Sequence, residues 1–366
     1  MQKIILLVHR YLGLTLGAIL LVVAFSGTAI VFKKPIDKFL NPALLQTAAG
    51  AGRAPIDDII RSAQASVAGK RASQVLLPQS AGDVIEVQFQ GSDLRAYADP
   101  YTGNLLGVRD VKASLMGILA DLHVHLLSGK TGERIMGWTG MGLLLLSAMG
   151  AYLWWPKNGR WDQAWAVKWG AAPLRVWMDF HKLVGSLAFV LIALTATTGA
   201  ALALYDIVTE PVLAALTGEG TRKPAPKSRL HDGGAAAIAP MMAHAATLFP
   251  NGKITRIALP GKTDGAVGIR MRLEGEIQSS GRSFLWFDQY DGALLRLDDA
   301  LQANQAAKIQ NWLFPLHTGA YGGLPTQFLQ VLVGLSLFLL SFSGVCLWWK
   351  RRRARASAKA RLRNPA

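Results

Sequence analysis

The chain has 366 residues, of which 51% are hydrophobic, and a formal net charge of +16. The basic residues are concentrated in a few short segments, while the two long connections between the apolar stretches are nearly charge balanced, so the charge does not indicate a nucleic-acid partner. Because Cys346 is the only cysteine, an internal disulfide and a two-cysteine redox motif are both excluded.

Four apolar stretches are long enough to cross a bilayer, which requires roughly 20 mostly apolar residues. They run from Tyr11 to Phe32, from Ile135 to Trp155, from Leu183 to Tyr205 and from Phe328 to Trp349. The first could instead be a cleaved signal peptide, since Lys3 and Arg10 give it a basic start, but its apolar run is long and has no clear A-x-A site. We therefore predict an α-helical integral membrane protein with four transmembrane helices in a lipid bilayer.

The distribution of Lys and Arg predicts how these helices are oriented. The chain after Trp349 reads KRRRARASAKARLR, and the connection from Pro156 to Trp177 carries four basic residues against Asp162. Short basic segments stay in the cytoplasm, whereas long segments cross the membrane largely regardless of their charge. We expect both termini in the cytoplasm and both long connections outside it.

The apolar stretches are related in pairs. Without gaps, HRYLGLTLGAILLVVAFSGTA at 9–29 aligns with HKLVGSLAFVLIALTATTGAA at 181–201. With one fixed shift, the region from LADLHVHLLSGK to LWWPK likewise matches the region from LFPLHTG to LWWKR. A signal peptide would leave the first of these matches unexplained, so we expect the first helix to be retained and the chain to be an internal duplication.

The two long connections also repeat one pattern. Each has a helix-like segment, near Pro55 to Val67 and Ile238 to Leu248, followed by alternating runs that indicate strands. Each then has a hairpin turn, DPYTG at 99–103 and DQYDG at 288–292. We predict two small α+β domains outside the membrane, one in each half of the chain.

These patterns divide the chain into eight segments. The predicted transmembrane helices are 1–32, 131–155, 178–205 and 326–349; the exported domains are 33–130 and 206–325; the cytoplasmic segments are the loop 156–177 and the basic tail 350–366.

Four of the seven histidines form two repeat-related pairs at helix ends. His9 and His181 lie at the cytoplasmic ends of the first and third helices, and His123 and His317 precede the second and fourth at the outer face. A single histidine could simply snorkel to the interface, but ionisable groups at membrane depth are costly and usually functional. Because a neutral imidazole is a good axial ligand for haem iron, and facing helices can hold one cofactor between them, the two pairs predict two haems.

Glycines occur at fixed distances from these histidines. At about 1.5 Å per residue, the helix from His9 to Gly27 spans roughly 27 Å, nearly the hydrocarbon thickness. This places Gly27 and Gly199 near the outer histidines, and Gly150 and Gly344 near the inner ones. The glycines could make room for a porphyrin or serve ordinary close helix packing.

Two basic residues, Arg10 and Lys182, directly follow the inner histidines. They could pair with haem propionates, and anchoring at the cytoplasmic interface explains them equally well.

His125 has no counterpart in the second half of the chain. It could be the outer ligand in place of His123, a spare ligand or a substrate group. We interpret His231 and His244, in the second exported region, as surface or packing residues. No nucleotide-binding loop, H-E-x-x-H or C-x-x-C motif occurs, so any electrons must come from an outside donor.

The histidine-led helices (HRYLGLTLG and HKLVG), DLHVHLLSG, PLHTG and the terminal GxxLWW resemble the PepSY-associated transmembrane helix family, and within it the FoxB-type inner-membrane ferrisiderophore reductases. The resemblance implies a bacterial inner-membrane protein with two PepSY-like periplasmic domains and two b-type haems. The implied ligands are His9, His181, His123 and His317; the family motif has a variable residue where this chain has His125.

The activity implied is haem-dependent reduction of a ferric siderophore, with electrons from an unknown cytoplasmic or membrane donor. Reduction to Fe(II) would release the iron, because oxygen-rich chelators hold the softer ion less tightly. Two alternatives stay open: a membrane-anchored PepSY-type binding or inhibitory module, and a haem-bearing membrane subunit of another oxidoreductase.

Overall fold

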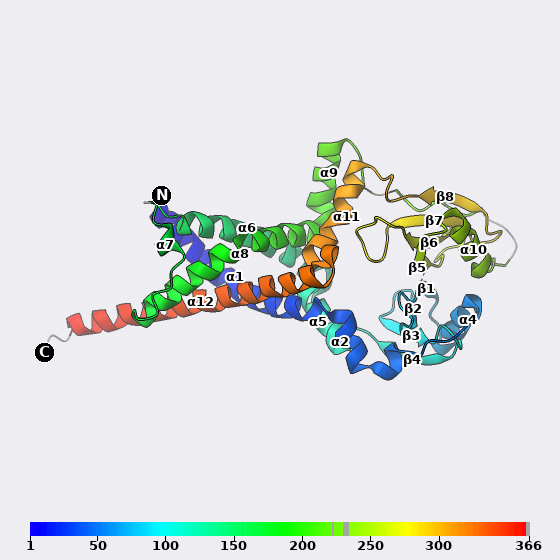
Figure 1. The fold of residues 1–366 in the computed structure, drawn as a ribbon, viewed down its shortest axis with the longest axis horizontal. Coiled ribbons are helices and arrows are strands. Elements are labelled where there is room, and N and C mark those ends of the chain that lie inside the picture. Colours follow the sequence, from blue (N-terminus) through cyan, green and yellow to red (C-terminus); the bar gives the residue numbers. More distant parts are fainter. Residues whose placement is uncertain (158, 222, 230–233, 364–366) are drawn as a thin grey trace. The chain divides into compact units, whose positions relative to one another are not determined.

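The computed structural model describes residues 1–157, 159–221, 223–229 and 234–363, and side chains as far as Ser357. These residues form two compact units (Figure 1). The helical unit comprises Met1–Val31, Leu119–Thr209 and Leu316–Ala366, and the sheet unit comprises Phe32–Ile118 and Glu210–Pro315. His231 lies outside the described residues.

Within the described residues, four helices are long and apolar enough to cross a membrane, which confirms the predicted number. They are α1 (Gln2–Ile30), α6 (Gly129–Trp154), α8 (Pro173–Ala203) and α12 (Leu324–Arg363). Three shorter elements complete the helical unit: α7 (Trp161–Ala164), the π-helix Tyr205–Thr209 and the 3₁₀ turn Ala320–Gly322.

The helices begin earlier than the apolar stretches. Helix α1 begins at Gln2 and helix α8 begins at Pro173, so His9 and His181 lie inside their helices, near these ends. Hydropathy identifies only the part of a helix that can lie in lipid. The helix itself continues, through its backbone hydrogen bonds, until a helix-breaking or capping residue ends it. Pro173 is such a start signal, because its missing N–H costs nothing in the first turn.

The four helices close into a bundle in which α1 and α8 each pack against both α6 and α12. Glycines bring the backbones together. A Cβ on Gly140 of α6 would meet Ala200 of α8 at 3.1 Å, and one on Gly334 of α12 would collide with Thr28 of α1.

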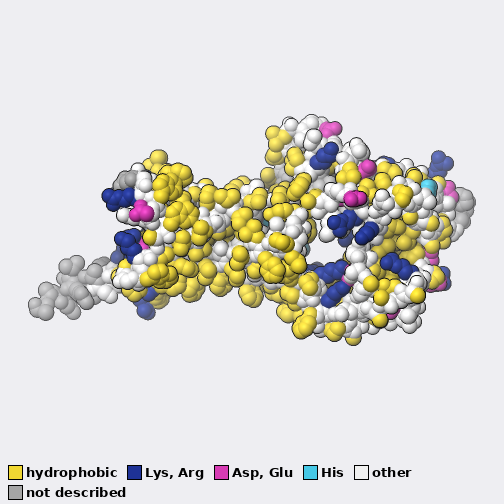
Figure 2. Space-filling view, viewed as in Figure 1, with side chains coloured by type: hydrophobic (Ala, Val, Ile, Leu, Met, Phe, Trp, Pro, Cys, Tyr) yellow, Lys and Arg dark blue, Asp and Glu magenta, His cyan; other side chains and the backbone are white. Residues whose placement is uncertain are grey.

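Large apolar side chains point away from the bundle as well as into it. Ile192 and Val333 are buried between α8 and α12, whereas Phe25, Leu187 and Leu332 are more than half exposed. Figure 2 shows hydrophobic side chains over the surface of the helical unit. A helix that is apolar on all sides is typical of a membrane span.

The sheet unit contains eight strands and the helices that border them. The strands are β1 (Ala72–Leu76), β2 (Ile85–Phe89), β3 (Leu94–Ala98), β4 (Leu105–Asp110), β5 (Lys253–Ala258), β6 (Ala266–Arg272), β7 (Ser283–Asp288) and β8 (Leu294–Asp298). The helices are α2 (Lys33–Leu40), α3 (Pro42–Leu45), α4 (Ile56–Ser66), α9 (Glu210–Thr217) and α10 (Ile238–Leu248). Two more, α5 (Leu115–His125) and α11 (Gln305–Thr318), continue into the helical unit.

All eight strands belong to one antiparallel sheet in the order β4-β3-β2-β1-β5-β6-β7-β8. The two predicted exported segments therefore share one sheet. Strands β1 and β5 pair directly, with Val75 opposite Ile257. Each strand thereby supplies hydrogen-bond partners for backbone groups that would otherwise be unpaired at an edge of the sheet. Helices α4 and α10 lie where the helix-like segments were predicted, and one continuous apolar core joins them to both halves of the sheet.

A cap also links the two halves. The carboxylate of Asp57, at the start of α4, accepts hydrogen bonds from the backbone N–H groups of Ile238 at 2.7 Å and Ala239 at 3.1 Å, at the start of α10. Such a cap accepts hydrogen bonds from N–H groups that have no partner within the helix. Its negative charge is also stabilised by the positive end of the helix dipole.

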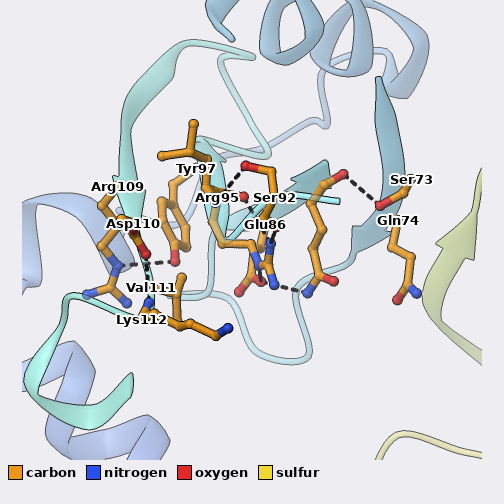
Figure 3. A network of polar contacts seen from close by, with 12 residues as sticks. Ser73, Gln74, Glu86, Ser92, Arg95, Tyr97, Arg109, Asp110, Val111 and Lys112 are labelled. Atoms are coloured by element: carbon orange, nitrogen blue, oxygen red, sulfur yellow. Dashed lines mark hydrogen bonds and ion pairs between the residues drawn. The ribbon is translucent and has the colours of Figure 1, made fainter. Parts of the chain in front are cut away.

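In the half of the sheet formed by β1 to β4, the opposite face carries a network of polar side chains, because successive strand residues point to opposite sides (Figure 3). Glu86 accepts a hydrogen bond from Gln88 at 2.9 Å and lies 3.4 Å from Arg95. Arg109 donates to the Tyr97 hydroxyl at 3.2 Å. Burial and then the charge of Glu86 raise the pKa of Tyr97 to about 12, so this hydroxyl stays protonated at neutral pH.

Asp83 joins helix α2 to the loop between β1 and β2. Its carboxylate accepts from Lys38, from Lys34 at 3.1 Å, and from the backbone N–H groups of Gln79 at 3.1 Å and Ser80 at 3.2 Å. Burial alone would raise the pKa of Asp83, but these donors outweigh burial and hold the pKa well below its usual range.

We expect Asp83→Asn to destabilise this corner of the sheet unit by about 2 kcal/mol, because two ammonium groups lose their counterion. Since the folded pKa lies below the unfolded value of about 3.9, the contribution is fully present above about pH 5 and is lost as the pH falls below about 4. Hydrogen exchange of the β1 and β2 peptides in the full chain measures both effects. Asp58→Asn, at a side chain that is 59% exposed, is the control; equal protection in the two variants would contradict the prediction.

Candidate functional site

The four predicted histidines lie in the helical unit as two facing pairs. The rings of His123, on α5, and His317, on α11, have centroids 6.2 Å apart with 37° between their planes. His9, on α1, and His181, on α8, are close enough to interact electrostatically. The structure therefore brings together each pair that the repeat alignment matched.

Short helices that end just before α6 and α12 position the outer pair. Helix α5 ends at His125, and Leu126 and Leu127 then turn the chain with left-handed φ angles of 47° and 56°. Helix α11 ends one residue after His317, followed by Gly319 with φ of 73°. Glycine adopts this conformation readily, while for leucine it is uncommon, so the first turn is held by its surroundings.

Backbone carbonyls orient both outer rings. Nδ1 of His123 lies 3.1 Å from the Val23 carbonyl oxygen of α1, and Nδ1 of His317 lies 3.1 Å from that of Thr195 on α8. A carbonyl can only accept, so each Nδ1 carries the proton and each Nε2 keeps its lone pair. This is the tautomer that a metal-binding imidazole needs, and such an N–H···O contact is its usual support.

The spacing of the outer rings fits one metal ion between them. Bonds from metal to imidazole nitrogen are about 2.0–2.1 Å long and the ring centroid lies about 1.2 Å behind the nitrogen, so two imidazoles on opposite sides of one metal have centroids about 6.4 Å apart. The separation of His123 and His317 is 6.2 Å. The measured separation agrees with this value, so His123 and His317 could hold one haem iron between them.

Each predicted glycine lies against a predicted histidine. A Cβ on Gly27 would come within 2.6 Å of Cε1 of His123, and a Cβ on Gly199 within 2.7 Å of Cε1 of His317. At the inner pair the contacts are looser: 3.4 Å from Gly150 to His9 and 3.8 Å from Gly344 to His181. At the outer pair, then, the absent side chain makes room for the imidazole itself.

The inner histidines differ in their hydrogen bonding. Nδ1 of His181 lies 2.8 Å from the hydroxyl oxygen of Ser343, which in turn donates to the Leu340 carbonyl at 3.1 Å. Nδ1 of His9 is buried and makes no hydrogen bond that meets the distance and angle limits in the described part of the chain, although the Leu146 backbone lies near the ring.

The two basic residues beside the inner pair also differ. Nε of Arg10 is buried without a partner among the residues described, and its guanidinium lies 4.8 Å from the Tyr11 ring centroid. An unsatisfied buried donor is costly, and an anionic group such as a haem propionate would satisfy it. Lys182 is exposed, as expected for an interfacial anchor.

His125 does not face His317. Its Nδ1 lies 2.8 Å from the Asp121 carboxylate one turn earlier on α5, and its side chain is 37% exposed. The i, i+4 spacing of Asp121 and His125 was a sequence signal that we missed. The structure thus places His123, and not His125, in the outer pair.

The remaining partners could not be read from residue types. Val23 and Thr195 contribute backbone carbonyls, and any residue type carries one. His244, in the sheet unit, packs with its ring centroid 5.6 Å from that of Phe287, which agrees with a packing role. No cluster of three or more His, Cys, Asp or Glu that could hold a metal ion occurs in the described residues.

A four-helix membrane bundle with partly buried histidines in pairs, joined to an antiparallel sheet, defines the class of this molecule: an integral membrane protein with paired-histidine sites. The chain belongs to the PepSY-associated TM region family, whose model matches residues 6–351. This confirms the predicted family, and the match includes every candidate site residue. A search of curated proteins finds no match.

Proposed function

We propose that this protein is a di-haem electron carrier of the bacterial inner membrane that reduces ferric siderophores at the periplasmic face and releases Fe(II). The observation that carries the proposal is the outer pair, His123 and His317. Their ring spacing suits a single metal ion, and both Nδ1 atoms are committed to carbonyl acceptors. A purely structural pair of histidines would not require this tautomer on both rings.

In this proposal each pair holds one haem. His9 and His181 hold the inner group, His123 and His317 hold the outer group, and the buried Nε of Arg10 serves an inner propionate. Bound haem supplies reversible one-electron transfer. The residues of the bundle position the groups at two levels and keep them away from water.

The topology follows from charge. Lys and Arg follow α6 and α12 in short segments with few acidic residues, which favours cytoplasmic termini, and the sheet unit then faces the periplasm. The proposed duplication accounts for the symmetric strand order about the β1–β5 pair and for two PepSY-like halves of four strands each. The sheet unit would then lie on the side where imported siderophores arrive.

The reaction needs one electron for each iron. A cytoplasmic or membrane reductant loses the electron, and Fe(III) in the chelate gains it to become Fe(II). Oxygen-rich chelators prefer the harder ferric ion, so the reduced iron is held less tightly and leaves. The outer pair, with its ligands fixed by Val23 and Thr195, is the proposed point of exit for the electron.

We expect purified protein to be red with a low-spin b-type spectrum and two haems per chain. After reduction with dithionite and removal of the excess, a ferric hydroxamate siderophore should reoxidise both haems and form Fe(II) that a ferrous-specific dye captures. The gallium complex of the same siderophore, which cannot accept an electron, is the control.

Other results would separate the alternatives. Colourless protein would contradict the proposal and favour an anchored binding module. Red protein that stays reduced when the ferric chelate is added would favour a membrane subunit of a different oxidoreductase.

A further inference from the structure

The two inner histidines are inequivalent although they occupy matching places in the repeat. His181 has a hydroxyl partner at Nδ1, whereas Nδ1 of His9 is buried with no hydrogen bond in the described structure. Both outer histidines have carbonyl partners. His9 is therefore the exception among the four rings and marks a place where the inner pair departs from symmetry.

The cause is one side chain on the neighbouring helix. His9 packs against Gly150 of α6, and His181 packs against Gly344 of α12. The residue before each glycine differs: it is Met149 in α6 and Ser343 in α12. A thioether cannot accept this hydrogen bond as well as a hydroxyl can, so the bridge exists only on α12.

Ser343 is well placed to act as that bridge. It is fully buried, accepts from Nδ1–H of His181 at 2.8 Å, and donates to the Leu340 carbonyl at 3.1 Å. The corresponding carbonyl near His9 is that of Leu146, three residues before Met149 just as Leu340 is three before Ser343. Without a hydroxyl between them, the His9 ring and this carbonyl do not reach hydrogen-bonding geometry.

The hydrogen bond has an electronic consequence. When Nδ1–H of a ligating histidine donates to an acceptor, the opposite nitrogen becomes more basic and the ring is held in one orientation. A more basic axial ligand stabilises ferric over ferrous iron, which lowers the reduction potential. The two ligands of the inner pair would then differ in strength, one supported by Ser343 and one unsupported.

We infer that Ser343 is a positioning residue that lowers the reduction potential of the inner haem through His181, and that Met149 withholds the same support from His9. This rests on the proposed function, because it requires haem at the inner pair. In this inference, Ser343 and Met149 tune the reduction potential of the inner haem, where the electron enters, although neither residue is a proposed ligand.

The test is a potentiometric titration of the full-length protein, followed by its visible spectrum. The inner transition is identified beforehand as the one that remains in His317→Ala. We expect Ser343→Ala to move this transition to a more positive potential, and Ser343→Thr, which keeps a hydroxyl, to leave it at the wild-type value. Met149→Ser should move the same transition to a more negative potential, because the introduced hydroxyl can bridge His9 to the Leu146 carbonyl.

The outcomes separate the inference from the proposed function. If the wild type holds two haems but neither Ser343→Ala nor Met149→Ser moves the inner transition, the inference is wrong and the proposed function stands. Movement of only the outer transition overturns the inference equally. Wild-type protein without haem overturns both.

Discussion

His317→Ala is expected to remove one of the two proposed haems and leave the other with an unchanged spectrum. The imidazole of His317 is one of only two candidate ligands at the outer pair, and a cavity beside Gly199 would replace it. A single histidine does not hold a low-spin haem as two do, so the haem content should fall by about half, as measured by the pyridine haemochrome assay.

Combining substitutions tests the pairing itself. His123→Ala with His317→Ala should cost no more haem than either change alone, because in the proposed site both rings would bind the same iron. His9→Ala with His317→Ala should remove both haems. His125→Ala and His244→Ala are matched controls, since one ring bonds to Asp121 and the other packs on Phe287. Loss of haem in either control, or additive loss within the outer pair, would contradict the assignment.

Gly27→Ala is expected to weaken the outer haem about 10–100-fold, the usual effect of disturbing the support of a metal ligand. The added methyl group would come within 2.6 Å of Cε1 and 3.0 Å of Nδ1 of His123. The ring must shift, and the shift would break its hydrogen bond to Val23. Titration of the haem-free protein with haemin measures the change.

Gly17→Ala is the matched control on the same helix. A Cβ at Gly17 would meet nothing within 4 Å, so only the helix propensity changes, which favours alanine by about 1 kcal/mol. Both variants should therefore keep or raise helix stability, and only Gly27→Ala should lose haem affinity. Equal affinity in the two variants would show that the close approach of Gly27 to His123 is not required.

The sequence predicted more of the site than of the sheet. The pairing of histidines and their contact with specific glycines followed from repeat alignment, because the rise of a helix converts residue number into depth. The sheet unit was predicted as two domains, because alternation shows that a segment is a strand and which face is apolar but not which edge it meets. Strand β1 pairs with β2 on one side, and on its other side it pairs with β5, about 180 residues further along the chain.

By itself, the sequence determined the number of helices long and apolar enough to cross a membrane, since this depends on local composition, and its self-similarity predicted which histidines form pairs. Only the tertiary structure decided which nitrogen of each histidine is engaged. Val23 and Thr195 contribute carbonyls that every residue type carries, and Ser343 reaches His181 only because α12 packs beside α8. Hydrogen bonding depends on distance and direction between chain segments, and those are properties of the packed bundle rather than of any one segment.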